Sequence, residues 1–536
     1  MANFTDRLAD VYGDRTLFLL DKPLETRYFS GDVLSYRDVN RLVRRAASML
    51  LRAGVKRGDR VALCTLNRIE LAFVEFGAQR IGAIPVPLNF MLTQKELQHL
   101  IVQSGAKIIV TDRAVLESNI CDRAQFPSIE KWIIVSSKDL PEGVQSFDTL
   151  MAEADESVEP VDLKDEDPAI IFFTAGTTGL PKGALLTSGG LMFAFRKYVR
   201  LAATLPTSRK RLALMVMPLA HTGGHQALLV HIALSTPSLV VGRFDPERML
   251  DYIEQYRVSW FAGIPTMYRM LIEAGAESRN LSSIDLWGGG GDAFPADLIQ
   301  KVRKLSPRSV FITGYGMAET AGQVSITPPF IFEGAGDACI GWFLPDVKWR
   351  LVDGEGRDVK RGEPGELLIK SPGMMHGYWN DPTATDKTFS DGWLRTGDLL
   401  RTGRFGAKYF VSREKEMIKV GGYSVFPAEV EQVLDQHPAI DRSVVVGLPH
   451  STKGELPVAA VQLKESVTEA ELLEWCKERI APYRCPRRFV FVDDIPVSFG
   501  MKPQRRLVRE RLIAMGIVVT ARSDRKSGSS AVVVIS

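Results

Sequence analysis

A ten-residue run at positions 174–183, Thr-Ala-Gly-Thr-Thr-Gly-Leu-Pro-Lys-Gly, combines threonine hydroxyls, glycines and a lysine. The apolar run 169–173 precedes it and predicts a buried strand. A glycine-rich loop after a strand can turn its backbone N–H groups toward an anion, and Thr and Lys then complete a phosphate cradle. We therefore expect the loop to bind a nucleoside triphosphate through Thr174, Gly176, Thr177, Thr178, Gly179 and Lys182.

The spacing of this loop differs from that of a Walker A motif. That motif places Gly-Lys followed by Ser or Thr after a glycine and four further residues. Here the position five residues after Gly176 is Pro181, and Lys182 precedes a glycine. A P-loop hydrolase is therefore disfavoured, and a plain turn rich in Gly and Pro is the alternative.

Two further glycine-rich segments also fit a nucleotide. Residues 314–320 read Gly-Tyr-Gly-Met-Ala-Glu-Thr, in which an aromatic ring can stack on a base and a carboxylate can hold Mg²⁺ against phosphate oxygens. Residues 288–292 read Gly-Gly-Gly-Gly-Asp, and successive glycines let a ligand approach the backbone closely. The alternatives are a strand end with a surface glutamate and a flexible linker.

Four more places in the sequence carry polar residues of interest. Asp398 ends the segment 393–398, and a carboxylate can accept both hydroxyls of a ribose, although an Asp after Gly is often a turn residue. A charge run occupies 412–423, and Lys502 lies in a basic segment; such runs are usually solvated. His221 lies in an apolar and glycine-rich stretch, where a lone histidine is more often structural.

Taken together, these segments resemble the adenylate-forming superfamily of acyl-CoA synthetases, peptide-synthetase adenylation domains and firefly-type luciferases. The resemblance extends from about residue 30 to residue 512, and the 174–183 loop closely matches the family signature Thr-Ser-Gly-Thr-Thr-Gly-x-Pro-Lys-Gly. The sequence departs from the family at three positions: Ala175 replaces the usual Ser, Ala318 the usual Thr or Ser, and Met501 the usual Gly.

The resemblance implies how ATP binds. The phosphates lie in the 174–183 loop, Mg²⁺ binds Glu319, and Thr320 is a catalytic candidate because Ala318 lacks a hydroxyl. Tyr315 packs on the adenine, and Asp398 and Arg413 reach the ribose. The remaining nucleotide-binding candidates are the glycine-segment residues Gly290, Gly291, Asp292, Gly314 and Gly316.

The resemblance also implies where the acid and CoA bind. His221, Thr222 and Gly290 line the acid site, and Lys502 stabilises the charge that develops at the α-phosphate. Lys415 is the hinge about which a small domain turns. The turn that approaches the pantetheine arm of CoA contains Gly421, Gly422 and Tyr423.

The implied activity is that of an ATP- and Mg²⁺-dependent acid–thiol ligase. It forms acyl-AMP with release of pyrophosphate and then a thioester with CoA. Two alternatives are open: an acyl-AMP ligase that loads a carrier protein in trans, and a nucleotide-binding homologue without catalysis. Fatty, alicyclic and aromatic acids are all compatible with the sequence, and the absence of an obvious pocket Arg or Lys disfavours dicarboxylic acids.

The elements that position these residues follow from hydrophobic periodicity. Strands at 60–64, 83–87 and 106–111 alternate with helices at 69–80, which we expect to be amphipathic, and 94–104. This alternation predicts an α/β fold with parallel sheets flanked by helices.

The later part of the chain predicts two further regions. Short strands and turns at residues 340–412 predict a β-rich subdomain. This subdomain belongs to a large domain that we expect to span residues 1–412. A hinge at 413–415 leads to a small, mobile α+β domain at 416–512, and 513–536 is a tail that we expect to be disordered. In the small domain we expect helices at 427–437 and 468–480 and strands at 442–446 and 458–463.

Composition narrows the class of protein. A hydrophobic content of 45% and a charged content of 24% are ordinary for a globular protein, and a net charge of +3 gives no argument for nucleic-acid binding. No apolar run is long enough for a transmembrane helix. The five scattered cysteines suggest no disulfide framework, so we expect a cytoplasmic protein. A homodimer is compatible with the sequence.

Overall fold

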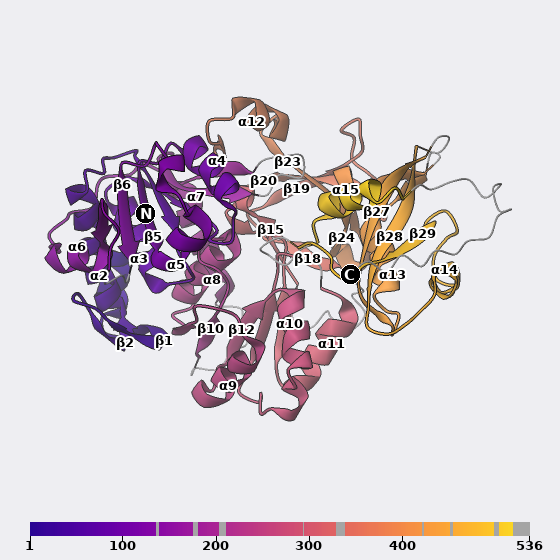
Figure 1. Cartoon of the computed structure of the whole chain (residues 1–536), viewed down its shortest axis with the longest axis horizontal. Coiled ribbons are helices and arrows are strands. Elements are labelled where there is room, and N and C mark those ends of the chain that lie inside the picture. The colour runs from indigo at the N-terminus through magenta and orange to yellow at the C-terminus, as the bar shows by residue number, and fades with distance from the viewer. Residues whose placement is uncertain are drawn as a thin grey trace. The chain divides into compact units, whose positions relative to one another are not determined.

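The structure is a computed structural model of the chain, and it describes residues 1–135, 139–174, 181–202, 211–292, 294–327, 338–420, 423–450, 454–497 and 503–517 (Figure 1). The chain divides into two compact units. The first comprises 1–336, 340–348 and 369–394, and the second comprises 337–339, 349–368 and 395–536. The chain thus passes into the second unit for the last time at Arg395, ahead of the predicted hinge at 413–415, which stays a prediction.

A seven-stranded sheet forms part of the first unit. Its neighbouring strands are parallel except for β1 and β2, which form an antiparallel pair. In spatial order the strands are β14 (Val310–Thr313), β13 (Leu286–Gly289), β12 (Trp260–Gly263), β10 (Ala213–Met215), β11 (Ser238–Val240), β1 (Thr16–Glu25) and β2 (Ser30–Ser35). The helices that alternate with them are α8 (Thr222–Ala233), α9 (Pro246–Tyr256), α10 (Pro265–Glu273) and α11 (Ala296–Leu305), and α10 packs against α9 and α11 (Figure 1).

A second sheet of the first unit is entirely parallel. Its order is β4 (Ile84–Pro87), β3 (Arg60–Cys64), β5 (Ile108–Asp112), β6 (Lys131–Val135) and β7 (Val144–Ser146). The helices α3 (Ile69–Arg80) and α4 (Gln94–Ser104) have the predicted bounds. Parallel sheets with intervening helices confirm the predicted fold class.

The prediction that α3 is amphipathic is wrong, because every one of its residues is buried. The helix α2 (Tyr36–Arg52) packs on it so closely that a Cβ at Gly77 would lie 2.9 Å from the backbone nitrogen of Ala47. Burial extends to polar residues: Arg80 is fully buried and pairs with Asp6 at 2.6 Å. A helix covered on all sides does not need a polar face.

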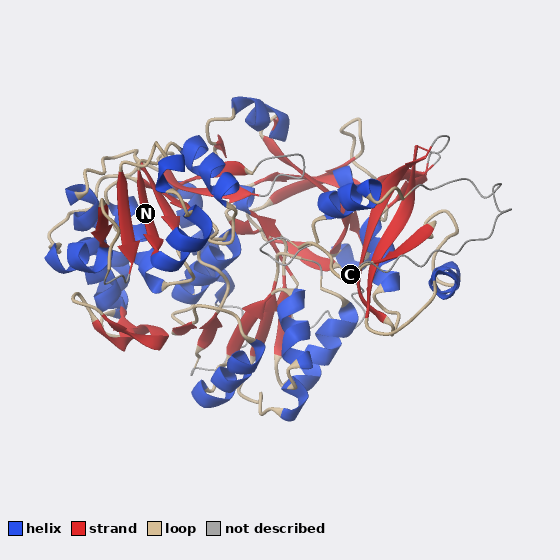
Figure 2. Ribbon diagram, viewed as in Figure 1, coloured by secondary structure: helices blue, strands red, loops and turns tan. Residues whose placement is uncertain are grey.

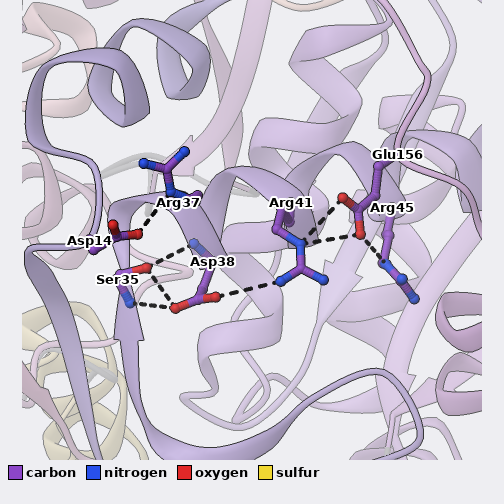
Figure 3. A network of polar contacts seen from close by, with 7 residues as sticks. All are labelled: Asp14, Ser35, Arg37, Asp38, Arg41, Arg45 and Glu156. Carbon is purple, nitrogen blue, oxygen red and sulfur yellow. Dashed lines mark hydrogen bonds and ion pairs between the residues drawn. The ribbon is translucent and has the colours of Figure 1, made fainter.

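The helix α2 is fixed at its N-terminus by a capping box. The Ser35 hydroxyl accepts a hydrogen bond from the backbone of Asp38, and the Asp38 carboxylate accepts one from the backbone of Ser35, both at 3.0 Å (Figure 3). Further along the helix, Arg41 and Arg45 both contact Glu156, at 3.3 and 3.0 Å (Figure 3). These contacts satisfy N-terminal amides of the helix and tie α2 to a distant part of the chain.

The third sheet of the first unit is antiparallel and contains the ends of the glycine-rich loop. Its order is β21 (Gly377–Tyr378), β9 (Lys182–Thr187) and β8 (Pro168–Thr174). The predicted strand at 169–173 is confirmed as part of β8. The loop therefore connects two antiparallel strands, in which Thr174 is paired with Lys182, rather than continuing the parallel pattern. The helix α7 (Ser188–Ala202) follows directly.

The predicted β-rich stretch 340–412 contains mostly short strands. They are β18 (Cys339–Phe343), β19 (Lys348–Val352), β20 (Gly365–Lys370), β21, β22 (Phe389–Ser390), β23 (Trp393–Thr402) and β24 (Lys408–Arg413). The remaining shorter elements of the first unit include α1 (Phe4–Tyr12), α5 (Arg113–Val115), α6 (Phe147–Glu153), α12 (Pro382–Thr388), β15 (Gly316–Met317), β16 (Gly322–Gln323) and β17 (Ser325–Ile326).

The second unit contains a five-stranded sheet around a pair of long antiparallel strands, β27 (Ile440–His450) and β28 (Gly454–Leu463) (Figure 2). The other strands are β25 (Ile418–Val420), β26 (Tyr423–Val425) and β29 (Arg488–Phe491), and the helices are α13 (Pro427–Leu434), α14 (Glu469–Lys477) and α15 (Arg505–Ala514). The helix α15 was not among the predicted elements, and it packs on β27 through the buried Val508 and Leu512.

Within the described ranges, no helix has the length and apolar character that crossing a bilayer requires.

The five cysteines are free, and four of them are buried.

Candidate functional site

The carboxylate of Glu319 lies where the glycine-rich loop leaves and rejoins the sheet. Glu319 occupies a short 3-10 turn, Ala318–Thr320, and is 5% exposed. Its Oε1 accepts hydrogen bonds from the hydroxyl of Thr174 at 3.4 Å and from the hydroxyl of Tyr378 at 2.9 Å. The ammonium of Lys182 lies 5.2 Å from the ring centroid of Tyr378. The structure thus brings together three residues predicted to bind ATP and Mg²⁺: Thr174, Lys182 and Glu319.

Tyr378 completes this group and was not among the residues predicted from the sequence. Burial raises the pKa of its hydroxyl, and the neighbouring Glu319 carboxylate raises it further, so the phenol remains protonated and donates to that carboxylate. Tyr378 is carried by β21, which pairs with β9 through Tyr378 and Ala184. Fifty-nine positions separate Tyr378 from Glu319, and no local sequence pattern marks it.

The donor set around Glu319 suits magnesium. Mg²⁺ prefers oxygen ligands, keeps several waters, and is commonly held by one or two carboxylates together with substrate phosphates. The described residues contain no group of three or more His, Cys, Asp or Glu side chains that would form an all-protein metal cage. Glu319 therefore fits a magnesium ion that is shared with a bound nucleotide.

Thr320, the second catalytic candidate, has its hydroxyl engaged by the backbone. The residue is 1% exposed, and its Oγ lies 2.7 Å from the carbonyl oxygen of Gly322 and accepts a hydrogen bond from the backbone nitrogen of Met317 at 3.1 Å. These contacts hold the turn that presents Glu319. The predicted catalytic role of Thr320 stays a prediction.

The two glycine-rich segments lie side by side at the carboxyl edge of the seven-stranded sheet. Gly289 in β13 is paired with Thr313 in β14, and a Cβ at the following Gly290 would lie 3.6 Å from the carbonyl oxygen of Gly314. The carboxyl ends of parallel strands are where ligands bind in open α/β sheets. Gly291 has φ +79°, which favours glycine, and the neighbouring Asp292 is exposed.

Packing explains why positions 314 and 316 are glycines. A Cβ at Gly314 would lie 1.6 Å from the Gln323 amide nitrogen, and one at Gly316 would lie 2.3 Å from the carbonyl oxygen of Gly322. Between them, Tyr315 is half-buried and donates its backbone N–H to the Ser325 hydroxyl at 3.2 Å. The backbone that carries the predicted adenine-stacking ring is therefore held in place.

His221, predicted to line the acid site, caps the N-terminus of α8. Its Nδ1 accepts a hydrogen bond from the backbone nitrogen of Gly223 at 3.1 Å, and the residue is exposed. Thr222 is the first residue of the helix and is half-buried. Gly224 has no room for a side chain, because a Cβ there would lie 2.0 Å from the carbonyl oxygen of Pro218.

One turn further along α8, His225 belongs to a buried polar pair that the sequence analysis missed. Its Nε2 lies 2.9 Å from Oε1 of Glu75 in α3, and both side chains are at most 4% exposed. Its ring centroid lies 5.2 Å from that of Phe172, two residues before Thr174 in β8. The pair therefore supports the strand that leads into the glycine-rich loop.

In the second unit, the two residues predicted to bind ribose are direct neighbours. Asp398 in β23 is paired with Arg413 in β24, and Arg413 Nε lies 3.2 Å from Asp398 Oδ1. Asp398 is buried, whereas Arg413 is partly exposed. This cross-strand pair agrees with a joint role for the two side chains.

Two further predicted residues of the second unit, Lys415 and Tyr423, flank the strand β25. Lys415 is exposed in a one-turn 3-10 helix, Glu414–Glu416, between β24 and β25. Tyr423 is 61% exposed, and its ring stacks on that of Tyr483 with centroids 4.9 Å apart. The predicted residues that lie outside the described ranges are Gly176, Thr177, Thr178, Gly179, Gly421, Gly422 and Lys502.

Comparison with known proteins identifies the family. The chain matches the model described as AMP-binding enzyme over residues 6–379, and the model described as AMP-binding enzyme C-terminal domain over residues 429–498. Feruloyl-CoA synthase of an Amycolatopsis species is 32% identical over 486 residues, which cover 90% of this chain and 94% of that protein. Long-chain-fatty-acid–CoA ligase of Escherichia coli is 30% identical over 532 residues, which cover 94% of each chain.

Solved structures agree over nearly the whole chain. O-succinylbenzoate CoA synthetase from Bacillus subtilis in complex with the acyl-adenylate OSB-AMP has a TM-score of 0.82 and 26% identity, covering 95% of this chain and 98% of that one. The same enzyme in complex with ATP and a magnesium ion has a TM-score of 0.81 and 26% identity, covering 94% and 99%. These findings confirm the resemblance drawn from the motifs, and the chain belongs to the AMP-binding enzyme family of adenylate-forming enzymes.

Proposed function

We propose that this protein is an AMP-forming acid–CoA ligase, which activates a carboxylic acid as acyl-AMP with release of pyrophosphate and transfers the acyl group to the thiol of CoA. The observation that carries the proposal is the convergence of Thr174, Lys182 and Glu319 at the ends of the glycine-rich loop. Relatives that act as CoA ligases on aromatic and on long-chain fatty acids support the reaction type and leave the acid open.

In this proposal the first unit holds the phosphates and the metal. Lys182 and the Thr174 hydroxyl bind the phosphate oxygens that leave as pyrophosphate, and Glu319, oriented by Tyr378, binds the magnesium ion. The bound ion supplies Lewis-acid stabilisation of the charge that develops on the phosphate oxygens. The side chains are held in position before the reaction, so they need little reorganisation as that charge develops.

The residues of the second unit enter the proposal through the family resemblance. Asp398 and Arg413 bind the ribose hydroxyls, and Lys502 stabilises the attack of the acid on the α-phosphate. After adenylation, rotation about Lys415 allows the segment from Gly421 to Tyr423 to contact CoA. Domain rotation would let one pocket serve two half-reactions.

The test is pyrophosphate release by the full chain with ATP, Mg²⁺ and a broad panel of carboxylic acids, followed by thioester formation with CoA or with an acyl carrier protein. At least one acid should give pyrophosphate above background, with CoA as the preferred acceptor. Background release across the whole panel would contradict adenylation. A preference for the carrier protein would contradict CoA as the acceptor.

Lys502→Ala tests the role given to the lysine. We expect adenylation to fall by at least about a hundredfold while nucleotide binding stays near that of the unaltered protein. Lys464→Ala is the matched control, because Lys464 is exposed in the same unit and its ammonium lies 3.7 Å from Asp441. Full adenylation by Lys502→Ala would remove Lys502 from the mechanism.

A further inference from the structure

Lys197 is a buried lysine whose charge no described carboxylate balances. It lies in α7 and is 6% exposed. Its ammonium donates a hydrogen bond to the carbonyl oxygen of Gln323 and lies 5.0 Å from the ring centroid of Tyr198. Among the residues that the structure describes, no Asp or Glu forms an ion pair with it, and burial is the sole influence on its pKa, which falls to about 8.

Gln323, whose backbone carbonyl Lys197 contacts, also carries a neutral polar side chain that is hydrogen-bonded to another. Gln226 of α8 donates its amide N–H to the amide oxygen of Gln323 at 3.1 Å. A Cβ at Gly322 would lie 2.7 Å from the amide oxygen of Gln226 and 2.8 Å from the hydroxyl of Tyr198. Both glutamines are only half-buried. Lys197, Tyr198, Gln226 and Gln323 thus form a polar cluster in which the two glutamines are partly exposed and Lys197 and Tyr198 are buried.

This polar cluster adjoins the residues predicted to bind the acid. The Gln323 amide packs directly against Gly314, whose carbonyl oxygen is close to Gly290, and Gln226 lies one helical turn after Thr222 in α8. The cluster and the acid-site candidates Thr222 and Gly290 all lie in the first unit. The two glutamines are carried by α8, which also carries Thr222, and by β16, which contacts α8.

An unbalanced buried ammonium is costly in the absence of a counter-ion. Transferring a charge from water to the protein interior carries a large desolvation penalty unless a partner compensates it. An ammonium has three N–H donors, and the described contacts use one of them, to a neutral carbonyl. A perturbed ionisable group beside a binding site is typical of a functional position.

We propose that Lys197, together with Gln226 and Gln323, determines substrate specificity by receiving a second carboxylate at the end of the acid remote from the group that is adenylated. The inference rests on the proposed ligase function and names its substrate class as dicarboxylic acids. It reverses the expectation from the sequence, which disfavoured dicarboxylic acids because no pocket lysine was apparent. Lys197 belongs to α7, whose sequence contains no pattern that marks an acid-binding lysine.

The experiment compares pairs of acids with the same carbon skeleton, one with a single terminal carboxylate and one with two, across a range of chain lengths. Pyrophosphate release gives kcat/KM for each acid with the full chain and with Lys197→Met. We expect the unaltered protein to prefer the dicarboxylic member of its best pair by about tenfold or more, and Lys197→Met to lose at least about tenfold of that preference. Lys301→Met is the control, because Lys301 is exposed in α11 of the same unit.

Two additional measurements distinguish a failure of this inference from a failure of the proposed ligase function. Lys197→Gln keeps a hydrogen-bond donor without the charge, so it should also lose the preference if it folds, which thermal unfolding checks. Calorimetric titration of the acid pairs in the presence of AMP reports binding without turnover. Binding of dicarboxylic acids that depends on Lys197, without pyrophosphate release, would support the inference and contradict the ligase function. An equal loss for both members of each pair, or a preference for monocarboxylic acids in the unaltered protein, would overturn the inference.

Discussion

The hydroxyl of Tyr378 donates a hydrogen bond of 2.9 Å to Oε1 of Glu319, across 59 positions of sequence. The bond joins the strand β21 to the turn that follows β15, and it fixes one oxygen of a carboxylate that is only 5% exposed. Thr174 contacts the same oxygen from β8. Three segments that are far apart in the chain therefore set the orientation of the proposed magnesium ligand.

Tyr378→Phe removes the hydroxyl and keeps the aromatic ring that the Lys182 ammonium contacts. We expect the Mg²⁺ concentration for half-maximal pyrophosphate release to rise by roughly tenfold, because a hydrogen bond to a charged group is lost. A magnesium titration at saturating ATP measures this shift. Tyr256→Phe is the control, because Tyr256 is a half-buried tyrosine of α9. An unchanged magnesium dependence would show that Tyr378 does not position Glu319.

Glu319→Gln replaces the proposed magnesium ligand by a neutral amide of the same shape. The rate of adenylation should fall by at least about a hundredfold, because no magnesium ion then stabilises the negative charge on the phosphate oxygens. Binding of ATP without Mg²⁺, followed by calorimetry, should change little. Glu277→Gln, at an exposed position of the first unit, should retain full activity. Retention of activity by Glu319→Gln would rule out the metal role.

The buried pair of Glu75 and His225 should contribute mainly to stability. His225→Leu leaves the Glu75 carboxylate buried without its partner, so we expect the free energy of unfolding to fall by about 3 to 5 kcal/mol. The double variant Glu75→Leu with His225→Leu should recover a large part of that loss, because no unpaired polar group remains. Chemical denaturation of both variants measures this. A double variant less stable than His225→Leu would contradict the assignment.

His231 should make the first unit sensitive to acid. The residue is buried, and its Nδ1 lies 2.9 Å from the Ser238 hydroxyl. Burial lowers its pKa from 6.5 to about 3, so the imidazole is neutral in the folded protein. Between these values the unfolded chain binds a proton that the folded chain does not. As the pH is lowered from 6.5 to about 3, the free energy of unfolding should therefore decrease, by up to about 1.4 kcal/mol per pH unit. Above pH 6.5 His231 should have no effect on it.

The measurement is chemical denaturation at several pH values for the unaltered protein and His231→Gln. The substitution should remove the part of the acid slope that His231 causes. His376→Gln is the control, because His376 is exposed. A slope that persists unchanged in His231→Gln would assign the acid sensitivity to other groups.

Much of the fold could be predicted because hydrophobic periodicity is a local property. The strand at 60–64 and the helices at 69–80 and 94–104 have the predicted bounds. The exposure of 69–80 could not be predicted, because it depends on α2 packing against Gly77. The helix α15 was missed because its many arginines resemble a solvated charge run, although Val508 and Leu512 bury one side of it.

The sequence by itself determined the family, the α/β fold class and the residues expected to bind the nucleotide, because these depend on residue types at fixed local spacing. Only the tertiary structure decided that Thr174, Lys182 and Glu319 converge, that Tyr378 joins them, and that the buried Lys197 donates to the backbone carbonyl of Gln323. The physical reason is the same in each case. The contacts join segments that are distant in the chain, and burial and hydrogen bonding at one segment depend on where folding places the others.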